Sequence, residues 1–342
     1  MDNKQIRFFL EIPYDELEGM NLQAKKRRKE GNEKELKEFY LGYLKKEKRL
    51  KAVTIGFSDL EGRFHMIDYD KKFFLNSYDN MTFDGSSVRG FSRQAESDLR
   101  LGIDWSAFWW LPSDVFGPGK VLMMGKINGR DEKPYQMDAR GVLQNYLDIL
   151  NKKYQYKVYV ANEVEGFLVK GINAEQIFNE KIGFELVSMG GYYHSLPNDV
   201  LRNFIDRAAE AQRAMGFENE KDHPEVAPSQ FELNYSYADA MIAADQIQIY
   251  KLICRQVARN MGMTATFLPK PVMGVNGSGM HTNISIFSKG KNLFHDKKGR
   301  GQLSDLAWKF IDKILSNAND ICLILNSSVN AYRRLDPHFE AP

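Results

Sequence analysis

The sequence is poor in cysteine, has no long apolar run and carries almost no net charge, and each absence excludes a class of protein. With two cysteines among 342 residues, the chain is not a disulfide-stapled scaffold, and a CxxC metal site is absent. Cys254 and Cys322 each fall in an apolar helical pattern, which predicts two buried, reduced thiols. A chain of this length can bury a sizeable core without such staples.

The N-terminal region offers only the short apolar run 8–10, which is too brief for a secretion signal and far below the length of a membrane span. We therefore predict a cytoplasmic protein with no membrane partner. Its composition, 43% hydrophobic and 27% charged, is that of an ordinary globular protein, and its length suits two domains.

Positive charge is concentrated near the N-terminus, although the whole chain has a net charge of only +2. Residues 21–51 contain 12 Lys and Arg against 5 Asp and Glu. A nucleic-acid-binding arm would explain this excess. However, acidic residues are interleaved, and Leu36, Tyr40 and Leu44 recur at helical spacing, which favours a solvated helix face and no nucleic-acid partner.

The pattern of elements changes near residue 135. Before it, alternation around a turn at residues 59–62 predicts a β-hairpin. After it, three segments carry the apolar i, i+3, i+4 stripe of a packed helix: residues 199–215, 239–261 and 304–325. The strands show no regular βαβ rhythm, so we predict an α+β fold with domains at 1–135 and 136–342.

Three predicted strands of the second domain place polar groups on one face and aliphatic groups on the other. The polar members are Glu163 and Glu165 on the first strand, Gln230, Glu232 and Asn234 on the second, and His281, Asn283 and Ser285 on the third. A single Glu-x-Glu pair is usually a solvated strand face, and a lone histidine is usually structural. Agreement among three strands instead favours a curved sheet with a polar inner face and helices outside.

Carboxylates gathered on that inner face would repel one another without a cation. Glutamate oxygens with one imidazole suit Mg²⁺ or Mn²⁺ better than zinc or iron, and such sites commonly hold nucleotide phosphates.

A series of motifs from about residue 51 to 342 resembles the type I glutamine synthetase family, and the motifs occur in family order. They are residues 82–87 (TFDGSS) followed by 96–98 (ESD), the Glu163/Glu165 strand, 190–192 (GGY), 220–232, 267–271 (FLPKP), 276–281, 330–335 (NAYRRL) and 339–342 (FEAP).

The resemblance implies a small N-terminal β-grasp-like domain, here with a basic helical extension, and a catalytic domain with a curved antiparallel sheet and outer helices. It also implies a homo-oligomeric ring assembly, a dodecamer, whose active sites lie between neighbouring subunits. Asp84 would then serve the active site of an adjacent subunit.

Matching positions imply ligand sets for two or more divalent cations and three substrates. One cation would be bound by Glu165, Glu225 and Glu232, and the other by Glu163 and His281. ATP would contact Glu220 and Ser285; glutamate would contact Asn276, Gly277 and Arg334; and ammonium would contact Asp84, Ser87, Tyr192 and Glu225.

The implied reaction belongs to glutamine biosynthesis and nitrogen metabolism. The ATP γ-phosphoryl group passes to the side-chain carboxylate of glutamate, and ammonia then displaces phosphate from γ-glutamyl phosphate. Asp84 would deprotonate ammonium, Arg334 would neutralise charge, and Glu340 would shield the intermediate from water.

The chain departs from the family pattern at three internal positions and at its end. His223-Pro224 stands in place of two histidines, Phe91 in place of a frequent tryptophan, and Asn283 in place of a frequent histidine. The sequence stops at Pro342, before the family segment that carries further arginines and a third ligand of the second cation. We expect a protein ending there to bind nucleotide or metal but to make little glutamine.

Two alternatives to an ammonia ligase remain open from the sequence. One is a γ-glutamyl ligase for a polyamine or another amine. Asp84, Ser87 and Tyr192 argue against it, because a compact anionic pocket suits a small cation. The other is a catalytically impaired assembly or regulatory subunit, which the missing C-terminal groups would explain.

Overall fold

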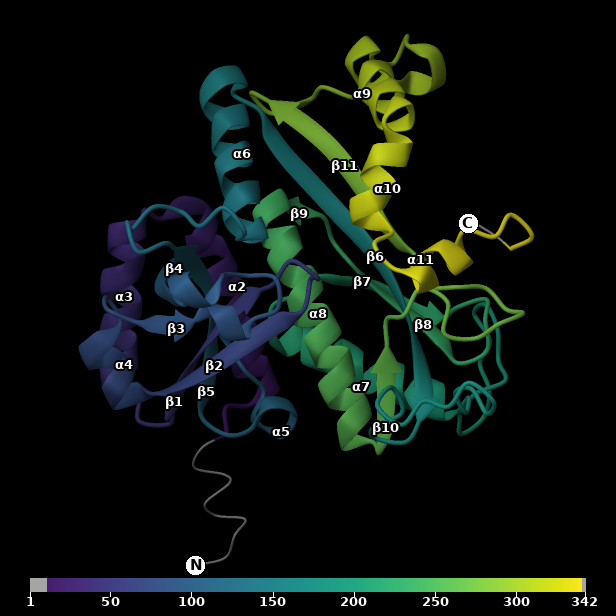
Figure 1. Ribbon diagram of the computed structural model, residues 1–342, viewed down its shortest axis with the longest axis horizontal. Coiled ribbons are helices and arrows are strands. Elements are labelled where there is room, and N and C mark those ends of the chain that lie inside the picture. The colour runs from purple at the N-terminus through teal and green to yellow at the C-terminus, as the bar shows by residue number, and fades with distance from the viewer. Residues whose placement is uncertain (1–10, 340–342) are drawn as a thin grey trace, which may run out of the picture. The chain divides into compact units, whose positions relative to one another are not determined.

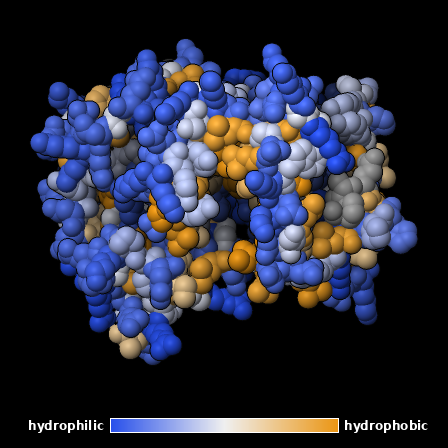
Figure 2. Space-filling model, turned by 90° about the horizontal axis from the view of Figure 1, so that it is seen from above, coloured by the Kyte–Doolittle hydropathy of each residue, from blue (hydrophilic) through white to orange (hydrophobic). Residues whose placement is uncertain are grey.

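The computed structural model describes residues 11–339, which form two compact α+β units (Figure 1). One unit comprises the chain up to Asp148 together with residues 210–218, and the other comprises 149–209 and the chain from Asn219 onward. In this part of the chain no helix combines the length and the apolar character needed to cross a bilayer. The face shown in Figure 2 is mostly hydrophilic, with apolar residues in separate patches.

The first unit is built on a five-stranded sheet in the order β2-β1-β5-β4-β3, in which only β1 and β5 are parallel. Its strands are β1 (Ala52–Ser58), β2 (Phe64–Asp70), β3 (Thr82–Asp84), β4 (Asp98–Trp110) and β5 (Lys120–Asn128). The predicted hairpin is confirmed by the pairing of β1 with β2. Asp59 closes its turn by accepting hydrogen bonds from the backbone N–H groups of Glu61 and Arg63, each at 2.9 Å.

Two helices, and not one, form the basic N-terminal segment: α2 (Tyr14–Glu30) and α3 (Glu33–Lys46). The first helix ends at Gly31. Asn32 then caps α3 by accepting a hydrogen bond from the N–H of Glu35 at 3.0 Å. The predicted stripe on α3 is buried, and the ring of Tyr40 stacks on Phe108 at 4.2 Å. The short helices α4 (Lys71–Ser77) and α5 (Ser113–Phe116) complete this unit.

Asn21 is a buried polar residue that fastens α2 to the rest of the first unit. Its side-chain amide nitrogen donates to the carbonyl oxygens of Trp110 at 3.0 Å and Ala214 at 2.8 Å, and its oxygen accepts from the N–H of Trp110 at 2.9 Å. Gly216 makes this approach possible: its φ is +74°, and a Cβ there would lie 2.9 Å from the Cβ of Asn21.

The second unit is built on an antiparallel sheet in the order β12-β11-β6-β8-β7, with β9 and β10 also paired to β6. Its strands are β6 (Lys157–Lys170), β7 (Asn219–Pro224), β8 (Gln230–Tyr235), β9 (Ala238–Asp239), β10 (Met263–Thr266), β11 (Met280–Ser288) and β12 (Lys291–Asn292). The long strand β6 is central: four strands (β8, β9, β10 and β11) pair with it directly, and β7 and β12 pair with β8 and β11.

Helices cover the apolar face of this sheet. The ring of Phe204 on α7 (Val200–Ala214) lies 4.8 Å from Phe231 of β8. The hydroxyl of Tyr250 on α8 (Ala240–Asn260) donates to the carbonyl of Val164 on β6 at 2.9 Å. The polar strand residues therefore lie on the opposite face, as the alternation predicts. The remaining helices are α6 (Ala139–Tyr154), α9 (Asp305–Ser316), α10 (Ala318–Leu325) and α11 (Val329–Arg334).

The two predicted helices at 199–215 and 239–261 are confirmed, whereas the third needs correction. Residues 304–325 form two helices that break at Asn317, whose side chain folds back and donates to the carbonyl of Lys313 at 2.7 Å. The predicted burial of both thiols is right for Cys254 and wrong for Cys322, which is partly exposed on the short α10. Burial raises the pKa of Cys254 far above its ordinary value, so this thiol is inert.

Replacing Asn21 with alanine should lower the free energy of unfolding by about 2–4 kcal/mol, because buried carbonyl and N–H groups lose their partners. Urea denaturation followed by tryptophan fluorescence measures this loss. The control is Asn32→Ala at an exposed helix cap, with an expected loss of about 1 kcal/mol. Equal losses in the two variants would contradict a fastening role for Asn21.

Candidate active site

A row of polar residues crosses four strands of the second unit on one face. Glu232 of β8 pairs in register with His223 of β7 on one side and with Glu165 of β6 on the other. Glu163, two residues before Glu165 on β6, pairs in register with His281 of β11. Register partners in an antiparallel sheet project to the same side, so these five side chains converge. The sequence pattern predicts four of them and does not assign His223.

His223, Glu225 and Glu232 form the tightest cluster, with one potential ligand atom of each lying within 4.8 Å of the others. His223 Nδ1 lies 3.4 Å from Glu225 Oε1, and His223 Nε2 lies 3.7 Å from Glu232 Oε2. All three residues are buried. Burial, and then the neighbouring Glu232, raise the pKa of Glu225 well above its ordinary value. Such a set of carboxylates is stable in its ionised form only beside a cation, so the cluster is a candidate metal site.

Glu165 accepts hydrogen bonds at one carboxylate oxygen and faces His281 with the other. Its Oε2 accepts hydrogen bonds from Gln230 Nε2 at 3.0 Å and from the N–H of Gly279 at 2.8 Å. Its Oε1 lies 3.7 Å from His281 Nε2, and this contact raises the pKa of His281. Gln230 also donates to the carbonyl of Gly277 at 3.0 Å. Sequence reasoning placed Gln230 on the polar face but gave it no role.

The loop before β11 comes close to Arg334. A Cβ on Gly277 would lie 2.9 Å from Arg334 Cγ and only 2.4 Å from the carbonyl oxygen of Pro269, so this position requires glycine. A Cβ on Gly279 would lie 3.0 Å from Arg334 Nη2. The helix that carries Arg334 is fixed by a reciprocal pair. Asn330 accepts from the N–H of Lys270 at 2.7 Å and donates to its carbonyl at 2.8 Å. Sequence reasoning did not find this pair.

Two tyrosines lie beside the buried histidine. The rings of Tyr192 and Tyr193 stack at 3.8 Å, and both meet the ring of His223 edge-on, at 5.5 and 4.7 Å. The hydroxyl of Tyr192 donates to that of Tyr193 at 2.8 Å, and this contact is the main reason that the pKa of Tyr192 rises to about 12. Tyr192 therefore lies next to the cluster.

Other predicted residues lie outside the cluster. Ser285 is four residues beyond His281 on β11, about 13 Å along an extended strand. Glu220 lies toward the other end of β7 and accepts a hydrogen bond from Ser236 at 2.9 Å. Asn276 directly precedes the Gly277 turn, and Glu340 lies outside the described residues.

Asp84 and Ser87 belong to the first unit, at the end of β3. Asp84 accepts hydrogen bonds from the N–H and hydroxyl of Ser86, at 2.9 and 2.6 Å, and from the hydroxyl of Ser87 at 2.5 Å. These bonds hold its pKa below the ordinary value of 3.8, so the exposed carboxylate is charged at neutral pH. A Cβ on Gly85 would lie 2.5 Å from Leu99 Cδ1, which explains the glycine in this turn.

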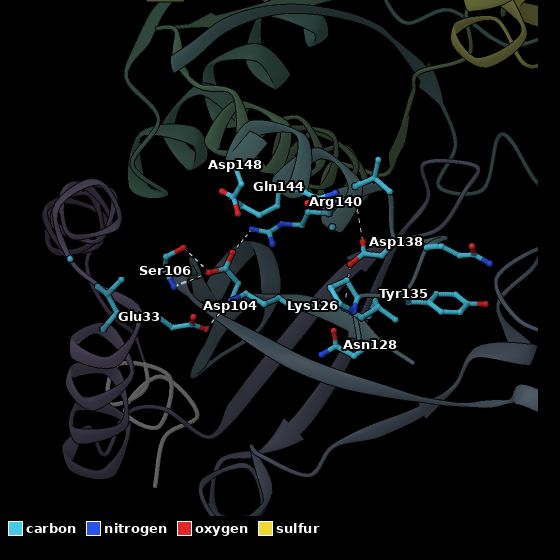
Figure 3. A pocket seen from close by; sticks show the side chains of 18 residues that line it. Glu33, Asp104, Ser106, Lys126, Asn128, Tyr135, Asp138, Arg140, Gln144 and Asp148 are labelled. Carbon is cyan, nitrogen blue, oxygen red and sulfur yellow. Dashed lines mark hydrogen bonds and ion pairs between the residues drawn. The ribbon is translucent and has the colours of Figure 1, made fainter. Parts of the chain in front are cut away.

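A separate cavity of about 750 Å³ lies wholly in the first unit (Figure 3). Its two cations are already paired: Arg140 with Asp104 at 2.6 Å and Lys126 with Glu33 at 2.8 Å. None of the site residues predicted from the sequence lines it. The carboxylate row of the second unit, and not this cavity, is therefore the candidate active site.

Comparison with known families covers both units. Residues 136–342 match the family described as "Glutamine synthetase, catalytic domain", and residues 49–127 match "Glutamine synthetase, beta-Grasp domain". Glutamine synthetase of Thermus thermophilus is 36% identical over 324 residues, covering 88% of this chain and 69% of that protein. The enzyme of Methanosarcina mazei is 35% identical over 301 residues, covering 87% of this chain and 65% of that one.

Solved structures give the same match. Glutamine synthetase of Plasmodium falciparum superposes with a TM-score of 0.77 at 25% identity, covering 91% of this chain and 64% of that chain. GmaS without ligand superposes with a TM-score of 0.73 at 25% identity, covering 84% and 66%. The chain thus spans about two thirds of the length of these relatives.

Replacing Gln230 with leucine should weaken Mn²⁺ binding about 10–100-fold, because Glu165 loses a hydrogen bond that orients it toward the cluster. Calorimetric titration measures the affinity, and circular dichroism verifies the fold. Gln176→Leu, at an exposed loop position of the same unit, serves as the matched control. Unchanged Mn²⁺ affinity in a folded Gln230→Leu protein would show that Glu165 is not a ligand oriented in this way.

Proposed function

The chain belongs to the glutamine synthetase family, and on that premise we propose that it ligates ammonia to L-glutamate with ATP, giving L-glutamine, ADP and phosphate. The observation that carries this proposal is the row of carboxylates and imidazoles across β7, β8, β6 and β11. Phosphoryl transfer to a carboxylate brings several negative charges together, and such a row can hold the cations that offset them.

The donor set fits hard divalent cations. We assign Glu165, Glu225 and Glu232 to one Mg²⁺ or Mn²⁺ and Glu163 and His281 to a second. The raised pKa of Glu225 supports the first assignment, because it reports a carboxylate buried beside others without a compensating charge. When bound, the cations would neutralise phosphoryl oxygens and orient them.

The protein's own side chains would position glutamate. Arg334 lies against the loop that contains Gly277 and Gly279, so its guanidinium offers a fixed positive charge to a substrate carboxylate. Asn276 and Gly277 would contribute polar contacts from the same loop. Glu220 and Ser285, which lie outside the cluster, are assigned to ATP.

We assign the ammonium pocket to Tyr192 and Glu225 of one subunit and to Asp84 and Ser87 of a neighbouring subunit in a homo-oligomeric ring. Asp84 suits this role because its hydrogen bonds keep it ionised, and a carboxylate attracts ammonium and can accept its proton. Glu340 is assigned to shielding the acyl phosphate from water.

Phosphate release from ATP, measured with glutamate and with or without ammonium, tests the proposal. We expect release to require both substrates and to produce glutamine. Methylammonium and a polyamine replace ammonium in parallel assays. A larger turnover with either amine would contradict an ammonia ligase and favour a γ-glutamyl ligase for that amine.

The variant Asp84→Asn should form glutamine about 10²–10⁴-fold more slowly, because it removes a positioned base, while its Mn²⁺ affinity stays unchanged. Asp131→Asn, at another exposed carboxylate of the same unit, is the control. Because the pKa of Asp84 lies below 3.8, its charge should not shape the rate profile between about pH 5 and 8. Wild-type turnover in Asp84→Asn would remove the residue from the mechanism.

A further inference from the structure

Ser229 adopts a backbone conformation that serine rarely takes. It is fully buried in the turn between β7 and β8, and its φ is +64°. A non-glycine residue in the left-handed region is sterically strained, and this conformation persists only where surrounding contacts enforce it. Its carbonyl accepts from the N–H of Leu168 on β6 at 2.9 Å, which fixes the turn to the central strand.

The hydroxyl of Ser229 uses its full hydrogen-bonding capacity on one distant segment. It accepts from the N–H groups of Val187 at 2.8 Å and Ser188 at 2.9 Å, and it donates to the carbonyl of Ser188 at 3.0 Å. A hydroxyl has one donor and two acceptor sites, so this side chain has no further bond to make. The hydroxyl thus links Ser229 to Val187 and Ser188, which lie 42 and 41 positions before it in the sequence.

The segment held by Ser229 leads directly to the two tyrosines. The N–H of Gly190 donates to Ser188 Oγ at 3.3 Å, and the N–H of Tyr193 donates to the carbonyl of Pro224 at 3.2 Å. Residues 187–193 are therefore tied to the β7–β8 connection at both ends. Tyr193 also has a positive φ of +58°, so backbone strain occurs at both tether points.

We propose that Ser229 is a positioning residue for the amine: its hydroxyl holds residues 187–193 so that Tyr192 lies beside Glu225 and His223. The proposal rests on the proposed function, which places Tyr192 in the ammonium pocket. Without the hydroxyl, one backbone group of the part-buried Val187 and two of the buried Ser188 lose their partner, and the segment moves away from the cluster. The affinity for amine then falls, whereas the affinities for ATP and metal, none of whose assigned ligands lies in residues 187–193, change little.

Two variants separate the hydroxyl from the backbone strain. Ser229→Ala removes the hydroxyl and keeps the strain, while Ser229→Gly removes the hydroxyl and relieves the strain, so the glycine variant should be the more stable. If the hydroxyl positions the segment, both variants should raise the KM for ammonium by about tenfold, while kcat and the KM for ATP change less than twofold. Ser195→Ala, at an exposed serine two residues beyond the 187–193 segment, is the control.

Hydrogen exchange provides a readout that does not depend on activity. Amides of residues 187–193 should exchange at least tenfold faster in both variants, and those of β6 should not. If the Ser229→Gly protein matched the wild type in exchange rates and in the KM for ammonium, the proposal would be overturned, because the hydroxyl would then not be needed to hold the segment. Faster exchange with an unchanged KM for ammonium would overturn it too. If the wild type shows no ammonium-dependent turnover, the proposed function fails, and the exchange rates alone decide whether Ser229 tethers the segment.

Discussion

The alternation of side chains along β6 is the constraint on which the second unit depends. This strand presents Glu163 and Glu165 to the polar face and Val164 to the helices. A slip of one residue in its register would exchange these faces and drive two carboxylates against α8. Burial of apolar groups on one side and convergence of charge on the other therefore enforce the same register.

The convergence of carboxylates on this face causes electrostatic repulsion, which neighbouring hydrogen-bond donors partly offset. Carboxylates buried side by side repel, and a raised pKa at Glu225 is the signature of that repulsion combined with desolvation. Gln230 and the N–H of Gly279 direct two hydrogen bonds at one oxygen of Glu165, which stabilises its ionised form. A divalent cation would supply what these neutral donors cannot.

The sequence predicts the strand faces and most of the polar row, because period-two alternation depends only on local geometry. It does not predict the roles of Gln230, Asn330 and Ser229, because these roles arise from contacts between segments far apart in the chain. The sequence also does not reveal the break at Asn317 or the exposure of Cys322, because an apolar stripe continues across both positions. The helix ends at Asn317, whose side chain bonds to the carbonyl of Lys313.

The short helix α11 shows how the placement of Arg334 depends on contacts from outside its helix. Six residues cannot form a stable helix by themselves, so the order of α11 comes from its surroundings, which include the reciprocal bonds between Asn330 and Lys270. The free energy of locally opening this helix therefore sets the fraction of molecules in which Arg334 is in place. In thermodynamic terms, substrate affinity and local folding of α11 are linked equilibria, and a ligand that binds Arg334 stabilises the helix by the same amount.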